Sequence, residues 1–348
     1  MALQALARTL ANAPAADALW GRDRLSVLAY HRVLPDGAVG THDPDLVSAT
    51  PQDFAAQMAY VARNFSVVSV WDLADHITDG TPLPQRPALI TFDDGYVDNF
   101  EHALPVLREH DLPSVVFLAT DFVDSTHVPW WDRLADIFAR ATPGTYELPM
   151  VGTVTLDGVD ANRAARVRML AELKAVGTDL IDPTLALAQE VLDVAPATPD
   201  RPLFMSWDQV TAAQRSGMDF QPHTVSHPIL TRVDPDRARA EVAGSCARVT
   251  ERTGRPCVAM AYPNGSYDDS VVEAGRDAGL VMAFTMELGP VRGRAISERA
   301  MVLPRVPISR RDDMCRFRLH VQGTTAAVFR AAALRTRRPT KRSKTLAT

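Results

Sequence analysis

The chain has 348 residues, of which 46% are hydrophobic, so it can bury a sizeable core in one large domain or two small ones. Its formal net charge of −5 gives no overall signature of nucleic-acid binding. No run of about 18 apolar residues occurs, so no transmembrane span is expected. The three cysteines, Cys246, Cys257 and Cys315, lack paired spacing, which argues against a disulfide framework and against a zinc ribbon.

The N-terminal segment, residues 1–24, has no unbroken apolar stretch of the signal-peptide kind, because polar residues interrupt its alanines and leucines. We therefore expect a cytoplasmic protein with reduced thiols. Residues 3–10 could form an amphipathic helix. This helix would either pack on the following domain, which is the favoured interpretation, or touch a membrane surface.

From residue 25 onwards, strand and helix patterns alternate, as in a parallel α/β fold. The first strands are expected over residues 25–31, 65–70, 88–92 and 114–120. A helix should begin at Pro51, whose fixed φ suits a first helical turn. Residues 97–110 should also be helical, with a kink at Pro105.

The strand over residues 88–92 runs into two adjacent carboxylates, Asp93 and Asp94, which are followed by Gly95. A buried parallel strand that delivers acids at its C-terminal end is how α/β enzymes present catalytic groups. Adjacent residues at a strand end point in different directions, so one carboxylate can bind a metal while its neighbour handles protons. The alternative is an Asp-Asp-Gly turn that only closes the strand.

Residues 121–204 interrupt the alternation, and we interpret them as a mainly helical insertion beside the site. The expected elements are a helix, a Thr- and Gly-rich hairpin and two further helices, over residues 127–141, 145–158, 162–176 and 183–194. Within the first helix, Trp130 and Trp131 could stack on sugar faces or anchor the insertion to the rest of the fold.

Four more strands follow the insertion, over residues 219–223, 258–262, 280–285 and 302–307, so that eight strands are expected in all. Ser206 and Gln209 predict a capping box for a helix that ends near Gly217. A long helix is expected over residues 234–253.

Two histidines lie where the strand over residues 219–223 ends. His223 and His227 are spaced so that both imidazoles can reach one cation. Pro228 disfavours helical dihedrals at His227, so a tight turn is expected there. Two histidines and one carboxylate would leave open coordination positions, as a catalytic metal site needs. The alternative is a pair of unrelated surface histidines.

At this point the chain resembles the polysaccharide deacetylases, the NodB-homology family (carbohydrate esterase family four). Residues 91–95, TFDDG, match the first motif of the family, and residues 223–227, HTVSH, match the second. Residues 262–267, YPNGSY, look like the third motif. Residues 28–33, LAYHRV, are similar to the opening strand of the circularly permuted members. The resemblance covers roughly residues 25–309.

The resemblance implies a role for each matching position. The metal ligands would be Asp94, His223 and His227, with zinc as the default metal and cobalt, nickel or iron(II) as alternatives. Asp93 would be the general base that deprotonates the attacking water, and His31 the general acid that protonates the departing amine. The backbone N–H of Asn264 would stabilise the oxyanion. The candidate substrate-contacting residues are Tyr262, Pro263, Arg305, Trp130 and Trp131.

The chain departs from the family pattern in its third and last motifs. Many members carry an arginine two residues before the proline of the third motif; Ala261 stands there, so another residue, with Arg305 as the candidate, must orient the base. The tyrosine that usually follows this proline is Asn264, which keeps the backbone role. A late Leu-Thr-His motif is missing, and His31 is preferred over His320 as the general acid.

The family resemblance also implies the architecture. We expect a distorted (β/α)7-type barrel, with one catalytic domain over residues 25–320 and a tail over residues 321–348. From Arg330 the tail holds seven basic residues and no acidic one. Such a run is most often disordered and solvated. Attraction to anionic lipid is the alternative, since a cytosolic deacetylase could meet a lipid-linked glycan at the inner membrane face.

The sequence therefore predicts a metal-dependent N-deacetylase that acts on an N-acetylated sugar in a polysaccharide, oligosaccharide or lipid-linked glycan. Its products would be a free amine and acetate. An O-acetyl esterase or a small-molecule amidase would use the same atoms. Two readings from other classes are a non-catalytic glycan-binding relic and a non-haem iron oxygenase, in which Asp93 would have no function.

Overall fold

The computed structural model describes residues 23–38, 42–196 and 198–324. The expected N-terminal amphipathic helix and the basic run after Arg330 lie outside these residues. Among the helices that are described, none is both long and apolar enough to cross a membrane.

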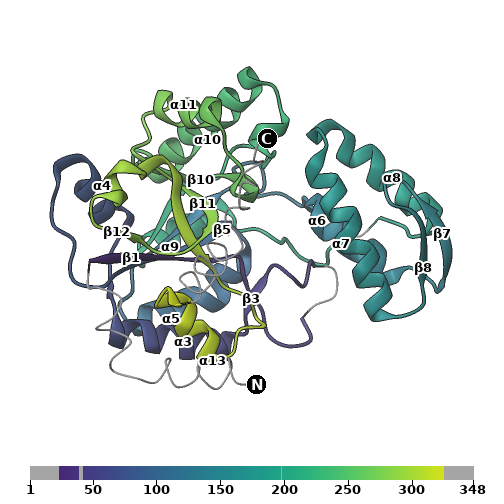
Figure 1. Ribbon diagram of the computed structural model, residues 1–348, viewed down its shortest axis with the longest axis horizontal. Helices are drawn as coiled ribbons and strands as arrows, with labels where there is room; N and C mark the ends of the chain where they lie inside the picture. The colour runs from purple at the N-terminus through teal and green to yellow at the C-terminus, as the bar shows by residue number, and fades with distance from the viewer. Residues whose placement is uncertain (1–22, 39–41, 197, 325–348) are drawn as a thin grey trace, which may run out of the picture.

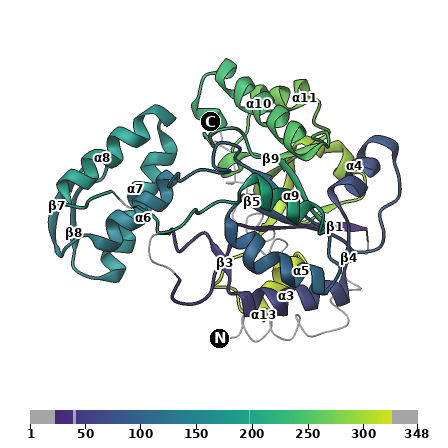
Figure 2. The same cartoon turned by 180° about the vertical axis from the view of Figure 1, so that it is seen from behind.

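The centre of the molecule is a parallel sheet that curls into a nearly closed barrel (Figures 1 and 2). Across the sheet the order is β10 (Ala259–Ala261), β11 (Met282–Leu288), β13 (Leu303–Pro307), β1 (Arg24–Tyr30), β5 (Pro87–Asp94), β6 (Ser114–Leu118) and β9 (Met218–Pro222). This order confirms the predicted (β/α)7-type barrel. Two short strands lie beside this path, β4 (Ser66–Val67) parallel to β5 and β12 (Val291–Arg292) antiparallel to β1.

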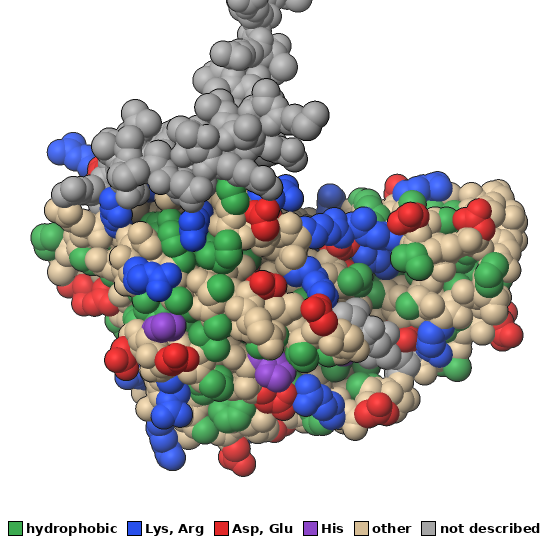
Figure 3. Space-filling model, turned by 90° about the horizontal axis from the view of Figure 1, so that it is seen from below, with side chains coloured by type: hydrophobic (Ala, Val, Ile, Leu, Met, Phe, Trp, Pro, Cys, Tyr) green, Lys and Arg blue, Asp and Glu red, His purple; other side chains and the backbone are tan. Residues whose placement is uncertain are grey.

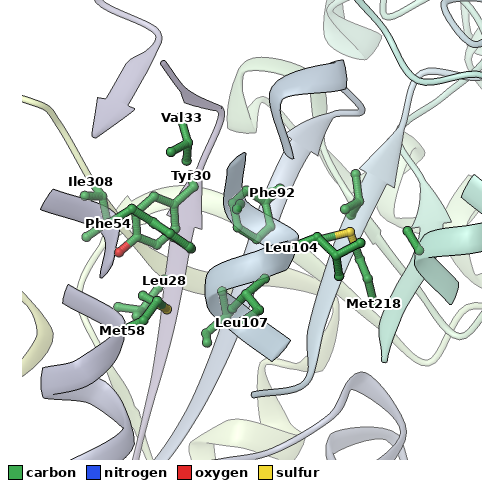
Figure 4. Packing of buried hydrophobic residues seen from close by; sticks show 14 of the residues in the cluster. Leu28, Tyr30, Val33, Phe54, Met58, Phe92, Leu104, Leu107, Met218 and Ile308 are labelled. Atoms are coloured by element: carbon green, nitrogen blue, oxygen red, sulfur yellow. The ribbon is translucent and has the colours of Figure 1, made fainter. Parts of the chain in front are cut away.

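Apolar side chains on both faces of the sheet explain why its strands are continuous hydrophobic runs. Every residue of β1, β5 and β6 is buried. Figure 4 shows one apolar cluster between the sheet and the helices outside it. In this cluster the ring centroid of Tyr30 lies 5.2 Å from that of Phe54, in an edge-to-face contact, and 5.5 Å from that of Phe92.

The barrel part contains the helices that the sequence predicted and several more. They are α3 (Pro51–Asn64), α4 (Val70–Asp79), α5 (Leu104–Glu109), α9 (Trp207–Gln214), α10 (Pro235–Thr253), α11 (Asp269–Asp277), α12 (Ala295–Glu298) and α13 (Met314–Val321). The capping box of Ser206 and Gln209 is present at α9. The predicted irregularity at Pro105 is a π-helical turn, Asn99–Ala103, that leads into α5.

One strand prediction is too long. The strand expected over residues 65–70 spans only Ser66–Val67, because Ser69 and Asp72 form a capping box that starts α4 at Val70. A side-chain cap satisfies helix N–H groups that a strand would place in a ladder. The sequence interpretation also missed α4, α11, α12 and α13.

Residues 121–204 contain the predicted helix, hairpin and two further helices. These are α6 (Trp130–Arg140), β7 (Gly144–Leu148), β8 (Gly152–Leu156), α7 (Val159–Ala175) and α8 (Ile181–Val191). They form a lobe beside the barrel (Figure 1) with an apolar core of its own, which includes Leu134, Phe138 and Met169. The domain boundaries given above stay a prediction.

A glutamine side chain bridges the two edge strands between which the barrel has no backbone hydrogen bonds. The sheet path stops at β9 on one side and at β10 on the other. Across this seam Gln221 Oε1 accepts hydrogen bonds from the backbone N–H groups of Val258 at 2.9 Å and Ala259 at 3.0 Å. The amide therefore replaces part of the missing ladder, and it holds β9 close to the start of β10.

Candidate active site

Two carboxylates end strand β5 at the edge where the parallel strands have their carboxyl ends. Asp93 and Asp94 are each 2% exposed. Asp94 has a φ of 73° and Gly95 a φ of 85°. A Cβ at Gly95 would lie 2.6 Å from a methyl carbon of Leu118, so only glycine fits this turn. The turn separates the directions of the two acids.

Asp94, His223 and His227 bring one ligand atom each within 4.8 Å of one another. The Nε2 atoms of His227 and His223 lie 3.2 and 3.6 Å from Asp94 Oδ1. That oxygen is buried and accepts no hydrogen bond from the described residues. Since a buried carboxylate oxygen without a partner is costly, the three side chains fit a divalent cation between them.

His223 is oriented by the barrel seam. Its Nδ1 lies 2.6 Å from the carbonyl oxygen of Ala261, which can only accept, so Nδ1 carries the proton and Nε2 is free to bind a metal. Burial lowers the pKa of His223 to about 4. Burial alone would raise the pKa of Asp94, but the imidazole of His227 and its neighbours hold it below the usual value. An ionised Asp94 and a neutral His223 are the charge states that metal binding requires.

The insertion lobe holds the second histidine. The ring of Trp131 lies 4.6 Å from the ring of His227, and its Nε1 donates to Tyr96 Oη at 2.9 Å. Trp131 is only 6% exposed, so it anchors the lobe on His227, and it also lines the cavity. Stacking of either tryptophan on a sugar stays a prediction. Trp130 is half-buried and lines the cavity.

Arg305 forms a two-pronged ion pair with Asp93. Its Nη1 and Nη2 each lie 2.7 Å from one of the two carboxylate oxygens, and its Nε donates to the Thr285 carbonyl oxygen at 2.9 Å. Burial would raise the pKa of Asp93, but the guanidinium holds it well below its usual range. The contact agrees with the hypothesis that Arg305 orients the base. Arg305 is fully buried and is not among the residues that line the cavity, so its assignment as a substrate contact stays a prediction.

His31 lies in the same cavity as the two acids, with its Nε2 3.8 Å from Asp93 Oδ2. Its backbone is fixed at both ends, because its N–H donates to Ser48 Oγ and its carbonyl oxygen accepts from Asn99 Nδ2. His320 lies on α13, 3.9 Å from Asp312, and does not line the cavity. The geometry therefore favours His31 over His320 for proton transfer.

The turn after β10 places backbone at the cavity wall. Asn264 and Gly265 have φ values of 57° and 68°, and both line the cavity. A Cβ at Gly265 would lie 2.5 Å from the backbone nitrogen of Met286. Tyr262 and Pro263 are different: both are buried outside the cavity lining, and Tyr262 Oη donates to the Met301 carbonyl oxygen. The cavity lining does not support their assignment as substrate contacts, which stays a prediction.

Comparisons with known proteins agree with this site. A family model for polysaccharide deacetylases matches residues 80–283 of the chain. The chain belongs to the polysaccharide deacetylase family. The poly-β-1,6-N-acetyl-D-glucosamine N-deacetylase of Escherichia coli K12 is 26% identical over 121 residues, which cover 34% of this chain. The match spans only 17% of the length of that relative.

Solved structures show the same fold as this polysaccharide deacetylase. The deacetylase PplD of Streptococcus pyogenes, in complex with acetate, matches with a TM-score of 0.56 at 16% identity, over 82% of this chain and 93% of PplD. IcaB from Ammonifex degensii matches with a TM-score of 0.56 at 19% identity, over 86% of this chain and 97% of IcaB. The circularly permuted arrangement stays a prediction.

The cavity at the candidate site has a volume of about 350 Å³. The sequence interpretation missed part of its lining, which comes from the loop before strand β3 (Val47–Ala49), from the insertion and from β11 and the end of β13: Asp43, Asp45, Leu170, Lys174, Met286 and Ile308. These residues lie outside the family motifs, and no local pattern marks them. Only the three-dimensional arrangement brings them to the site.

A buried polar network behind the metal centre was also missed. Arg32 Nε donates to Asp98 at 2.9 Å, and its guanidinium lies 4.2 Å from the ring centre of Tyr96. Asp132, to which the sequence interpretation gave no role, lies 3.8 Å from Arg32 and accepts from the backbone N–H of Asp43. Burial raises the pKa of Asp132 to about 7, although Arg32 opposes this. Asp98 stands only four residues after Asp94, and this closeness in sequence could have marked it as a residue near the candidate site.

Proposed function

We propose that this chain is a metal-dependent N-deacetylase that removes acetate from an N-acetylated sugar in a polysaccharide, oligosaccharide or lipid-linked glycan. The observation that carries the proposal is the separation of roles at one cavity. Asp94, His223 and His227 converge on one point, while Asp93 is held apart from them by Arg305. Membership of the polysaccharide deacetylase family and the named activity of the Escherichia coli relative support the substrate class.

The residues of the chain divide the chemistry of amide hydrolysis among them. A divalent cation, with zinc as the default, would supply a lowered water pKa and an electrophile for the acetyl carbonyl. Asp93 is kept ionised by Arg305 and so can accept the proton of the attacking water. His31 would donate a proton to the departing amine, and the Asn264 N–H would donate to the oxyanion.

The proposed partner is the glycan itself, and nucleic acid is not among the partners we propose. Figure 3 shows basic and acidic side chains interspersed over the face that it presents, without a field of one sign. The cytoplasmic location and the contact of the basic tail with an anionic membrane stay predictions, because both rest on terminal segments outside the described residues.

The proposal is tested by acetate release from N-acetylglucosamine oligomers and from a lipid-linked glycan fraction. Metal-stripped protein should release almost none, and zinc or cobalt should restore release. An O-acetylated glycan measured alongside distinguishes an esterase, which would release acetate from the ester alone. Release that survives chelation, in protein shown to be metal-free, would contradict the proposal.

The choice of general acid gives a second prediction. His31→Ala should lower turnover by about 10²–10⁴-fold with zinc content unchanged, because a positioned general acid contributes about this much. His320→Ala should stay close to the wild type, since His320 does not line the cavity. Turnover and zinc content of both variants are measured together. Loss of turnover in His320→Ala alone would transfer the role to that residue.

A further inference from the structure

One face of helix α7 in the insertion carries three basic residues and a leucine, and this face is turned towards the barrel. These four residues recur at three- and four-residue intervals, which places them in one stripe along the helix: Arg163, Arg166, Leu170 and Lys174. The two arginines contact carboxylates of the loop before β3. The last two members of the stripe line the active-site cavity.

The two carboxylates opposite this stripe, Asp43 and Asp45, already form ion pairs with arginines. Arg166 contacts Asp43 at 2.5 Å and Asp45 at 2.6 Å. Arg163 lies 3.3 Å from Asp45, and Arg311 contacts the same carboxylate. Three guanidinium groups therefore meet these two carboxylates, so the negative charge of Asp43 and Asp45 is already balanced before any lysine is considered.

Lys174 adds a further positive charge at the cavity wall. It is half-buried, and it lines the cavity with Leu170, one turn earlier on α7, and with Trp130 of α6. Its ammonium makes no ion pair within 4.0 Å and no hydrogen bond among the residues that the structure describes. Burial lowers the pKa of Lys174, although the charge of Asp43 opposes this. A partly desolvated ammonium without a partner is costly unless a ligand supplies one.

The choice of side chain agrees with a ligand-binding role. Lys174 is the only lysine in residues 1–340, where every other basic side chain with a permanent charge is an arginine. Arginine suits fixed two-pronged pairs such as those of Arg166 and Arg305. An ammonium on a flexible stem can follow a ligand that arrives from solvent.

We infer that Lys174 binds an oxyanion of the substrate, a carboxylate or a phosphate, next to the N-acetyl group that is removed. The inference rests on the proposed function and narrows its substrate class to acidic glycans. The cavity, at about 350 Å³, is near the lower end of the range of about 300–1,000 Å³ that is usual for ligand sites. The acidic group must therefore belong to the reacting sugar or to its immediate neighbour.

The test compares kcat/KM for three substrates of zinc-loaded protein. A tetrasaccharide of alternating N-acetylglucosamine and glucuronic acid supplies a carboxylate, N-acetylglucosamine 1-phosphate supplies a phosphate, and an N-acetylglucosamine tetramer is neutral. The wild type should prefer one of the acidic substrates over the neutral one. Lys174→Met should lower this preference by about tenfold to a hundredfold, as expected for a lost hydrogen bond to a charged group.

Two further variants separate the site from general electrostatics. Lys174→Arg keeps the charge and should retain most of the preference. Arg168→Met removes a positive charge from an exposed position of α7 that does not line the cavity, and should leave the preference unchanged. Equal loss of preference in Lys174→Met and Arg168→Met would overturn the inference, as would a wild type that does not prefer either acidic substrate.

A binding measurement tests the role of Lys174 independently of whether the protein is a deacetylase. Calorimetry with zinc-loaded protein compares two deacetylated probes, a glucosamine–glucuronic acid disaccharide and a glucosamine dimer, which cannot be turned over. Absence of acetate from every substrate would count against the deacetylase alone. The inference itself is overturned if the acidic probe binds no tighter than the neutral probe, or if Lys174→Met does not weaken it.

Discussion

Asp93→Asn is expected to lower acetate release by about 10²–10⁴-fold while the bound zinc is retained. The amide cannot accept a proton from water, and a positioned base contributes a factor of about this size. Asp93 does not belong to the group of three metal ligands, so zinc content should match that of the wild type. By contrast, Asp94→Asn should lose the metal, because Asp94 Oδ1 faces both imidazoles.

The control for this prediction is a buried, paired carboxylate far from the cavity. Asp219, near the start of β9, contacts Arg255 at 3.0 Å and does not line the cavity. Asp219→Asn should lose stability with little change in turnover of the folded protein. Steady-state acetate release, zinc content and thermal unfolding are measured for both variants. More than about a tenth of wild-type turnover in Asp93→Asn would exclude Asp93 as the base.

Arg305→Met is expected to lower both the stability of the fold and the activity of the site. Removing one partner of a buried ion pair typically costs about 3–5 kcal/mol, because the other charge stays buried and uncompensated. Without the guanidinium the pKa of Asp93 should rise, so less of the base is ionised and the acid limb of the pH–rate profile moves to higher pH. Urea unfolding and kcat/KM between pH 5 and 9 measure the two effects.

The pH dependence of this stability difference has a definite sign. Because the pKa of Asp93 is depressed in the folded protein, its stabilising contribution is present above the usual carboxyl pKa of about 4. The contribution is lost as the pH falls through the folded-state pKa. The gap between wild type and Arg305→Met should therefore be widest at neutral pH and narrow in acid. Arg305→Lys keeps one charge without the two-pronged contact and should lie between them. A methionine variant as stable and as active as the wild type would contradict the assignment.

Local signals explain why much of the fold could be predicted. Continuous apolar runs such as β5, and caps such as Ser206 with Gln209, act over a few residues, so the sequence alone indicates them. The strand expected over residues 65–70 failed because two signals competed there. The cap at Ser69 satisfied the backbone of a helix start better than a longer strand would have done.

The sequence by itself predicted the barrel, which the structure confirms, and the grouping of Asp94, His223 and His227 as a candidate metal site, because each depends on residue types at fixed spacing along a strand end or turn. It could only suggest Arg305, which stands 212 residues from Asp93 in the chain and reaches it across the barrel. The surroundings of Lys174 and Gln221, and the contact of Trp131 with His227, were decided by the tertiary structure alone. Each acts through a contact with a segment distant in sequence, and such contacts follow from how the lobe and the barrel seam pack, which no local pattern records.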